Sequence, residues 1–192
     1  SLGREEILRG GGPSTAIECW IKVGADRDGI ITGIKARIAF NSGAYPGAPI
    51  QSAVRRVFSH YRVANLKVDA FDVVTNRPPN TAYRAPGATP TAFALESVID
   101  ELADKGGMDP LEFRFRNVSR AGDLMPDGNT LPTINLEQVL EQVSEHPCWT
   151  TPLEGPNRGR GLAVGMWTMP GGTISCHVNV NYDGSLNLVL GI

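Results

Sequence analysis

Residues 80–117 read NTAYRAPGATPTAFALESVIDELADKGGMDPLEFRFRN and contain the clearest helix signals of the chain. Thr89 is a suitable N-cap, and Pro90 follows it at the first helical position, where a missing backbone N–H does no harm. At 100° per residue, a single apolar arc is formed by Ala94, Leu95, Val98, Ile99, Leu102 and Ala103. The glycines at 106–107 are typical of a helix end. This stretch therefore predicts a long amphipathic helix that begins near Thr89.

A second helix is predicted directly after the first. Asp109 can cap it, Pro110 can open it, and Glu112 completes a capping box three residues after the cap. Its apolar residues alternate with arginines, and the pattern ends near Asn117. The two predicted helices are thus separated by only a short, glycine-containing turn.

Strands are predicted on both sides of these helices. Residues 15–45 indicate a β-hairpin, because two β-branched, apolar runs flank the turn sequence DRDG, and residues 173–192 indicate another around Asp-Gly. Residues 65–76 alternate as a further strand, whereas residues 50–62 fit a short helix or an irregular segment equally well. Residues 136–146 predict another helix, capped by Asn135 and Gln138 and stopped by Pro147. The order of elements indicates the α+β class, a mixed sheet packed with two or three helices.

The composition excludes several classes of protein. The chain has 192 residues and a net charge of −2, which gives no electrostatic reason to expect a nucleic-acid partner. No apolar run approaches the roughly 20 residues that cross a bilayer, so no membrane span is predicted. Three scattered cysteines suit a reducing, cytoplasmic compartment. Cys176 and His177 are adjacent in a predicted strand and point to opposite faces, which argues against a shared metal site.

The loop around Arg84 is the best candidate for a binding site. A helix that starts after it directs free backbone N–H groups and the positive end of its dipole toward the loop. Gly87 permits a close approach of the backbone, while Pro86 and Pro90 stiffen the loop. Arg84 would add a bidentate donor for phosphate or carboxylate. The alternative is that Arg84 pairs with an acidic residue and the loop is a plain connection; the chain could also be a non-catalytic binding or structural module.

Other candidate sites have weaker signals. His60 fits a packed or surface residue better than a base, and Glu96 fits a buried structural carboxylate better than a catalytic acid. The glycines at 10–12 follow no predicted strand and lack the lysine of a phosphate loop. The basic RGRG at 158–161 is most simply solvated. Residues 165–173 mix large apolar residues with glycine and could line a pocket or end a strand.

Residues 79–117 resemble a signature stretch of the molybdenum hydroxylases, in the large molybdopterin-binding subunit of the xanthine dehydrogenase, aldehyde oxidase and carbon monoxide dehydrogenase family. The resemblance combines an Asn-x-x-Tyr-Arg loop, a helix that carries Ala-Leu-Glu, and the continuation GMDPLEFRFRN. The flanking sequences GREE, DRDGIITGIKARIAFNSGAY and NYDGSLNLVLG fit as well. The resemblance thus covers the whole chain and is most specific at its centre.

The resemblance implies an enzyme that hydroxylates an aldehyde or heterocycle with oxygen derived from water. Residues 1–192 would be a fragment of the first molybdopterin-binding domain, with a possible sub-boundary near 118–134. Tyr83, Arg84 and Ala85 would contact molybdopterin, expected in its cytosine dinucleotide form. Electrons would leave through [2Fe-2S] clusters and FAD on an iron–sulfur subunit and a flavin subunit, in an oligomer.

Departures from the family pattern narrow these expectations. Pro86 stands where xanthine-oxidising members place a stacking aromatic residue, and a pyrrolidine ring has no π face, so a purine substrate is disfavoured. The loop also lacks the cysteine-bearing pattern of carbon monoxide dehydrogenases. A substrate-orienting arginine would be Arg55 or Arg56, unless a register shift places Ser52 there. The family's glycine-rich cofactor loop and catalytic glutamate segment are both missing, so the 192 residues by themselves are expected to hold no cofactor, no metal and no catalytic residue.

Overall fold

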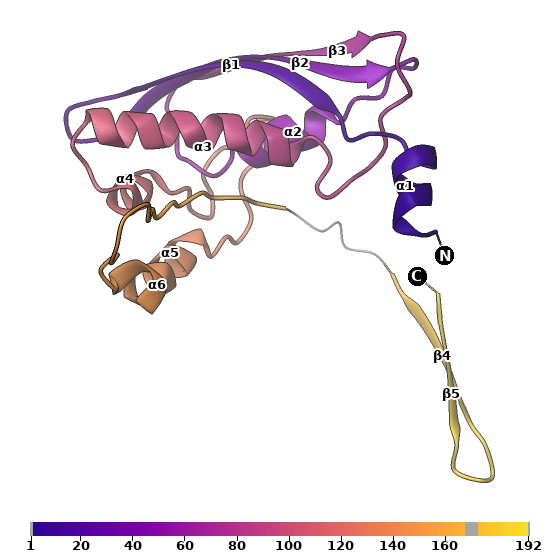
Figure 1. Ribbon diagram of the computed structural model, residues 1–192. Helices are drawn as coiled ribbons and strands as arrows, with labels where there is room; N and C mark the ends of the chain where they lie inside the picture. The colour runs from indigo at the N-terminus through magenta and orange to yellow at the C-terminus, as the bar shows by residue number, and fades with distance from the viewer. Residues whose placement is uncertain (1, 168–172, 192) are drawn as a thin grey trace.

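The computed structural model describes residues 2–167 and 173–191. Its main body contains a sheet of β1 (Ala16–Ala25), β2 (Ile31–Gly43) and β3 (Leu66–Val74), in that order. The pair β1–β2 is antiparallel, which confirms the predicted hairpin, whereas β3 runs parallel to β2. The helices of the body lie beneath one face of this sheet (Figure 1), so the described body is an α+β arrangement of two layers.

The β1–β2 turn is fixed by Asp26. Its Oδ1 accepts hydrogen bonds from the backbone N–H groups of Asp28 at 3.0 Å and Ile30 at 2.9 Å. Gly29 adopts a φ of +77°, which a residue with a Cβ would adopt only with strain. The turn chemistry therefore sets the register that places the apolar side chains of both strands on the helix-covered face.

Three helices pack near this sheet: α2 (Ile50–Val57), α3 (Ala88–Lys105) and α4 (Pro110–Asn117). The ambiguous stretch after residue 50 is thus a helix for its first two turns. The predicted start of α3 is wrong by two residues: Gly87 is the cap, and Thr89 lies inside the first turn. Gly87 takes the left-handed conformation with a φ of +72°, and this lets the chain turn into the helix earlier than Thr89 would.

The glycine end of α3 and the Asp109 cap of α4 confirm the predictions, whereas the Glu112 side chain pairs with Arg116 and does not complete the predicted capping box. Gly106 follows the last residue of α3. The side chain of Asp109 accepts hydrogen bonds from the N–H groups of Leu111 at 2.9 Å and Glu112 at 3.0 Å. This short connection folds α4 back under α3, as the lower part of the body shows in Figure 1.

The core lies between the sheet and α3. Leu95, Ile99 and Ala103 of α3 are fully buried together with Ile38 and Phe40 of β2. The buried face of α3 also includes Thr91 and Glu96, whereas Ala94 and Val98 of the predicted apolar arc are only half-buried. Compared with the predicted arc, the buried face of α3 is therefore rotated so that it includes these two polar residues. They can be buried because both have hydrogen-bond partners inside the protein.

The remaining helices are α1 (Arg4–Gly10), α5 (Leu136–Glu145) and the single turn α6 (Pro147–Thr150). Asn135 precedes α5 as predicted, although its side chain makes no capping hydrogen bond. A second, smaller apolar cluster joins α4 and α5 to a later extended segment through Leu111, Val118, Leu140 and Val164. Among the described residues, no helix is both long and apolar enough to cross a bilayer.

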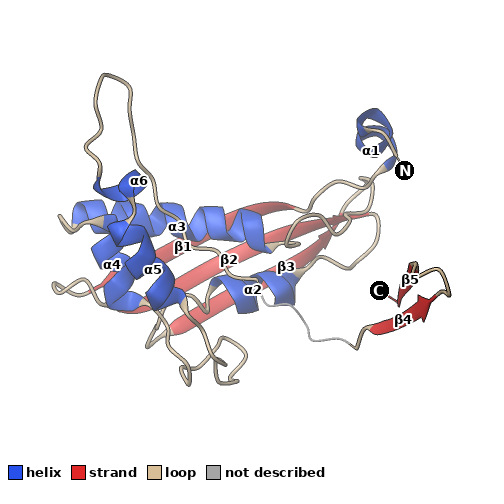
Figure 2. Cartoon of the chain, turned by 90° about the horizontal axis from the view of Figure 1, so that it is seen from below, coloured by secondary structure: helices blue, strands red, loops and turns tan. Residues whose placement is uncertain are grey.

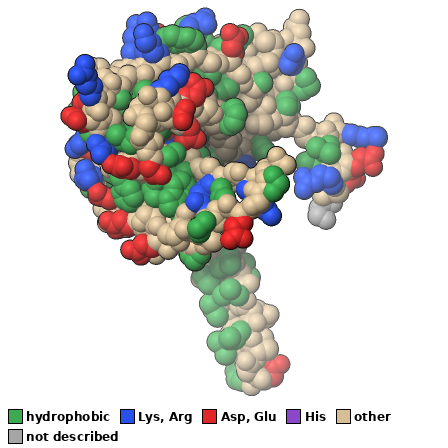
Figure 3. All heavy atoms as spheres, turned by 60° about the vertical axis from the view of Figure 1, so that its left-hand side comes forward, with side chains coloured by type: hydrophobic (Ala, Val, Ile, Leu, Met, Phe, Trp, Pro, Cys, Tyr) green, Lys and Arg blue, Asp and Glu red, His purple; other side chains and the backbone are tan. Residues whose placement is uncertain are grey.

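The strands β4 (Ser175–Val180) and β5 (Leu186–Gly191) form the predicted second hairpin. This hairpin projects away from the body, and every residue of both strands is exposed (Figures 1 and 3). Cys176 pairs with Leu190 and His177 with Val189, so the two side chains point to opposite faces. The described residues contain no cluster of three potential metal ligands. The stretch 165–173, named above as a pocket or strand end, lies largely outside the described residues.

Candidate functional site

The loop before α3 has an unusual backbone. Arg84 and Ala85 adopt positive φ angles of 37° and 56°, and Gly87 follows with 72°. A left-handed conformation costs about 1–2 kcal/mol for a residue that carries a Cβ. Two such residues in sequence persist only where the surrounding structure holds them, and strain of this kind is concentrated at binding sites.

The loop is held at its start by the ends of β1 and β2. The Nδ2 atom of Asn80 donates to Thr15 Oγ1 at 2.9 Å and to the carbonyl of Asn41 at 3.2 Å, and its backbone N–H donates to Ser42. Thr81 Oγ1 donates to the carbonyl of Gly12 at 2.7 Å. These bonds fix the position from which residues 82–86 extend.

The other end of the loop is pressed against α2. A Cβ added to Gly87 would lie 2.9 Å from the carbonyl oxygen of Pro49 and 3.1 Å from the Cβ of Ala53. Thr91 Oγ1 also donates to the Gly87 carbonyl at 2.8 Å. Only glycine fits here without strain, so the loop is clamped between α2 and α3, two elements seen side by side in Figures 1 and 2.

Arg84 has no ion pair or side-chain hydrogen bond with any residue that the structure describes, so the alternative of a structural ion pair is not observed there. Tyr83 is 60% exposed beside it, whereas Ala85 and Pro86 are half-buried. In addition, no side chain caps the N-terminus of α3. An exposed guanidinium next to an uncapped helix N-terminus is an arrangement that favours an anion.

A groove of about 800 Å³ runs beside Tyr83. Glycines 10–12 form part of its wall, and Arg4 and Arg9 of α1 line it as well. Arg9 pairs with Glu5 at 2.7 Å, a bond within the same helix. The glycine run therefore borders the candidate site, although it does not form a phosphate loop of the strand–loop–helix type.

Glu96 is a structural residue, as predicted. It is 4% exposed, and its carboxylate accepts hydrogen bonds from Tyr61 Oη at 2.7 Å, Arg114 Nε at 3.0 Å and the Val164 N–H at 2.8 Å. Arg114 is fully buried and also pairs with Asp100 at 2.8 Å. Burial, together with the charge of Glu96, raises the pKa of Tyr61, so its hydroxyl stays protonated as a donor. This network ties α3, α4 and the 160–167 segment together.

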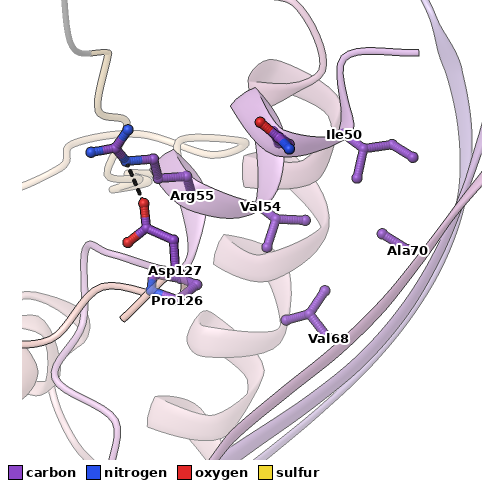
Figure 4. A pocket seen from close by; sticks show the side chains of 8 residues that line it. Ile50, Val54, Arg55, Val68, Ala70, Pro126 and Asp127 are labelled. Carbon is purple, nitrogen blue, oxygen red and sulfur yellow. Dashed lines mark ion pairs between the residues drawn. The ribbon is translucent and has the colours of Figure 1, made fainter. Parts of the chain in front are cut away.

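A second cavity, of about 410 Å³, lies between α2 and β3 (Figure 4). Ile50, Val54, Val68 and Ala70 give it an apolar interior. In Figure 4, Arg55 reaches toward the loop that carries Asp127, and their side chains form an ion pair of 3.1 Å beside the cavity. Arg55, predicted as a substrate-orienting residue, therefore lines a pocket but is already engaged.

Arg56 lies in different surroundings from Arg55. Its guanidinium stacks over the ring of Trp167 at 3.9 Å, and its Nη1 donates to Ser52 Oγ. Asp127 is a site residue that the sequence analysis missed, and Trp167 lies in the stretch 165–173 that was named only as a possible pocket lining. Neither stretch has a periodicity that would predict its contact with α2.

His60 is packed inside the protein. Its side chain is fully buried, and neither ring nitrogen has a hydrogen-bond partner among the described residues. Burial lowers its pKa to about 4. The imidazole is therefore neutral at pH 7, which agrees with a packed residue and not with an exposed base.

The comparisons with known proteins identify the family. The sequence profile of the molybdopterin cofactor-binding domain matches residues 1–118. The chain belongs to this family. It is 30% identical, over its full length, to a protein of Escherichia coli O157:H7 named xanthine dehydrogenase molybdenum-binding subunit, and covers 28% of that protein. It is 40% identical over half of its length to an Escherichia coli K12 protein named aldehyde oxidoreductase molybdenum-binding subunit, and covers 13% of it.

Solved structures agree with the family assignment. The aldehyde oxidoreductase of Desulfovibrio desulfuricans matches 92% of this chain with a TM-score of 0.72 and 27% identity, while the match spans 21% of that protein. This chain thus spans about a quarter of the length of the curated relatives it matches. The fold and family predicted from residues 79–117 are confirmed, whereas the roles assigned to Tyr83, Arg84, Ala85, Pro86, Arg55 and Arg56 stay predictions.

Proposed function

We propose that this chain forms one wall of the cofactor and substrate site of a molybdenum hydroxylase. The observation that carries the proposal is the strained, clamped loop that presents Arg84 without a partner among the described residues. The cofactor would be molybdopterin in its cytosine dinucleotide form. Electrons would pass to [2Fe-2S] clusters and FAD on partner subunits of a cytoplasmic oligomer.

The residues present fit an anionic cofactor. The Arg84 guanidinium can donate two parallel hydrogen bonds to an oxyanion, and the N-terminus of α3, whose cap Gly87 follows three residues later, has the positive end of a helix dipole. Because Gly87 and Asn80 fix both ends of the loop, the backbone at Arg84 would lose little conformational entropy when a ligand binds. When bound, the molybdenum cofactor supplies the two-electron oxidation chemistry. The residues of this chain bind and orient it.

Pro86 bears on the class of substrate. It lies beside Arg84 and is half-buried, so it presents a small saturated ring where an aromatic ring would allow stacking. The cavity beside α2 is lined by apolar residues of α2 and β3 together with the Arg55–Asp127 ion pair. An aldehyde or a small heterocycle therefore suits the site better than a purine.

The test uses the native protein that contains this chain, purified with its partner subunits. Metal analysis and turnover of an aromatic aldehyde are compared with turnover of xanthine. We expect bound molybdenum and faster aldehyde oxidation, with turnover lost in Arg84→Ala and retained in the matched variant Arg77→Ala, an exposed arginine earlier in the same loop. Full activity of Arg84→Ala would overturn the role of this residue, and absence of molybdenum would overturn the function.

A second candidate, an autonomous anion-binding module, is favoured by the exposure of Arg84. It is separated from the first by calorimetric titration of the 192-residue chain with pterin phosphates and simple carboxylates. An autonomous module binds one of these by itself. A chain that forms only one wall of a larger site should bind neither pterin phosphates nor carboxylates. We expect this outcome for the isolated chain, which would then also be inactive.

A further inference from the structure

The face of the β1–β2–β3 sheet opposite the helices carries a row of lysines. Lys22 of β1 lies opposite Lys35 of β2, which in turn lies opposite Lys67 of β3. All three side chains are exposed. Like charges directly opposite each other destabilise a sheet, so this row weakens the fold that contains it.

The three lysines line one shallow groove. It has a volume of about 730 Å³, and its wall includes all three side chains together with Gly24 and Gly33. These two glycines lie opposite each other next to the lysine row, so the floor of the groove there is backbone without side chains. The groove thus offers both positive charge and room for an incoming chain.

The next rows of the same face have the composition of a protein interface. Trp20 is 53% exposed and lies opposite Arg37, and Arg37 stacks on the 44%-exposed ring of Phe71 at 5.0 Å. Exposed tryptophan, phenylalanine and arginine side chains are enriched where proteins bind proteins. Among the described residues, the helices of the body lie on the other face (Figure 1), and Lys and Arg side chains gather along the upper surface of the body in Figure 3.

We infer that this face docks an acidic helix of another polypeptide. Neighbouring strands lie about 4.8 Å apart, so the lysine row spans about 10 Å. Residues at i, i+3 or i+4, and i+7 of a helix present side chains over a similar distance, with a rise of 1.5 Å per residue. Glutamates at that spacing would meet the three ammonium groups, while apolar residues beside them would meet Trp20 and Phe71.

A polypeptide fits this face better than a nucleic acid. Glu18 and Asp69 lie on the same face, and Asp69 is 3.8 Å from Lys67, so the positive charge is local and bordered by negative charge. The chain as a whole is negative. A uniformly charged phosphate backbone that ran on past the row would meet repulsion from these two carboxylates, which lie on the same side of the row, whereas a helix with a single acidic stripe along the row would not.

The test measures anisotropy of a fluorescein-labelled helical peptide that carries glutamates at this spacing and leucines beside them. The native protein is compared with Lys35→Glu, which turns the row into alternating charges. We expect Lys35→Glu to weaken binding about tenfold or more and, by removing repulsion, to raise Tm by about 2–4 °C. Trp20→Ala should weaken binding as well without a rise in Tm.

The controls separate specific docking from general attraction. A triple variant with Arg27→Glu, Lys105→Glu and Arg158→Glu changes exposed charges away from the row and should alter the affinity less than about twofold. A peptide with glutamine in place of glutamate should not bind. Equal binding of the two peptides, an unchanged affinity in Lys35→Glu, or tighter row-dependent binding of a DNA oligonucleotide would each overturn the inference.

Discussion

Arg84 and Arg114 lie 30 positions apart in one signature stretch and have opposite environments. Arg114 is fully buried, forms ion pairs with Glu96 and Asp100, and donates a hydrogen bond to the carbonyl of Pro110. Arg84 is exposed on a strained backbone, with no side-chain partner among the residues that the structure describes. Arg114 thus stabilises the packing of the helices, whereas Arg84 is exposed in the loop that precedes α3.

This difference separates a region that stabilises the fold, around Arg114, from a region that presents a candidate binding group, around Arg84. The Arg114 network fastens α3 to α4 and to the extended segment at Val164. A rigid α3 in turn fixes the loop at its N-terminus, because Thr91 binds the Gly87 carbonyl. The buried arginine therefore supports the exposed one through the helix between them.

The largest expected effect comes from breaking the buried network. Arg114→Ala leaves the Glu96 carboxylate buried without its charged partner, and such a loss lowers the free energy of unfolding by about 3–5 kcal/mol. Chemical denaturation followed by circular dichroism measures this change. Arg116→Ala is the matched control, since Arg116 is exposed and pairs with Glu112 within α4; it should cost less than about 1 kcal/mol. Equal effects of the two variants would contradict the comparison.

The buried His60 predicts a pH dependence of stability. Its folded pKa of about 4 lies below the ordinary 6.5, so between these values the unfolded chain binds a proton that the folded chain does not. Stability is therefore fully present above pH 6.5 and falls as the pH approaches 4, by about 3 kcal/mol from this residue. Urea denaturation at several pH values tests this, with His60→Leu expected to flatten the profile.

The exposed His177 of the hairpin is the control for that profile. His177→Leu should leave the pH dependence between 6.5 and 4 as it is in the parent chain. A profile that His60→Leu does not alter would show that the acid sensitivity comes from other groups.

Gly87 connects the Arg84 loop to α3, and its substitution should have an intermediate effect on the free energy of unfolding. Gly87→Ala combines a positive φ with a Cβ placed 2.9 Å from the Pro49 carbonyl, so we expect a loss of about 2 kcal/mol or more. Gly128→Ala has a similar φ of +79° with no neighbouring atom within 4 Å, and should lose only about 1 kcal/mol. The difference in unfolding free energy between the two variants isolates the contact with α2, and its absence would contradict the clamp.

Local patterns in the sequence predicted much of the fold. The Asp109–Glu112 cap, the glycine end of α3 and the two hairpin turns each depend on neighbouring residues, and all are present. The start of α3 was misplaced because Thr89 and Pro90 are good capping residues in isolation. The helix instead begins after Gly87, because the close approach of Gly87 to Pro49 and Ala53, which are distant in the sequence, fixes the position of the turn.

The site was less predictable than the fold. The helix pattern predicted that Glu96 is buried, whereas the loop pattern left open whether Arg84 faces an anion or pairs with an acidic residue, and neither pattern specified the partners. Asp127 meets Arg55 and Trp167 meets Arg56 only after folding brings irregular segments against α2. The parallel pairing of β3, which creates the lysine row, is likewise a long-range contact that no local pattern specifies.

The most direct test of the central claim is the variant Arg84→Gly in the native protein. Glycine accepts a φ of 37° without strain, so the free energy of unfolding should stay level or rise by about 1 kcal/mol. If Arg84 is a binding group held in a strained loop, the same variant should lose bound molybdenum and pterin. Retention of full cofactor content, or a loss of stability like that of Arg114→Ala, would contradict the account.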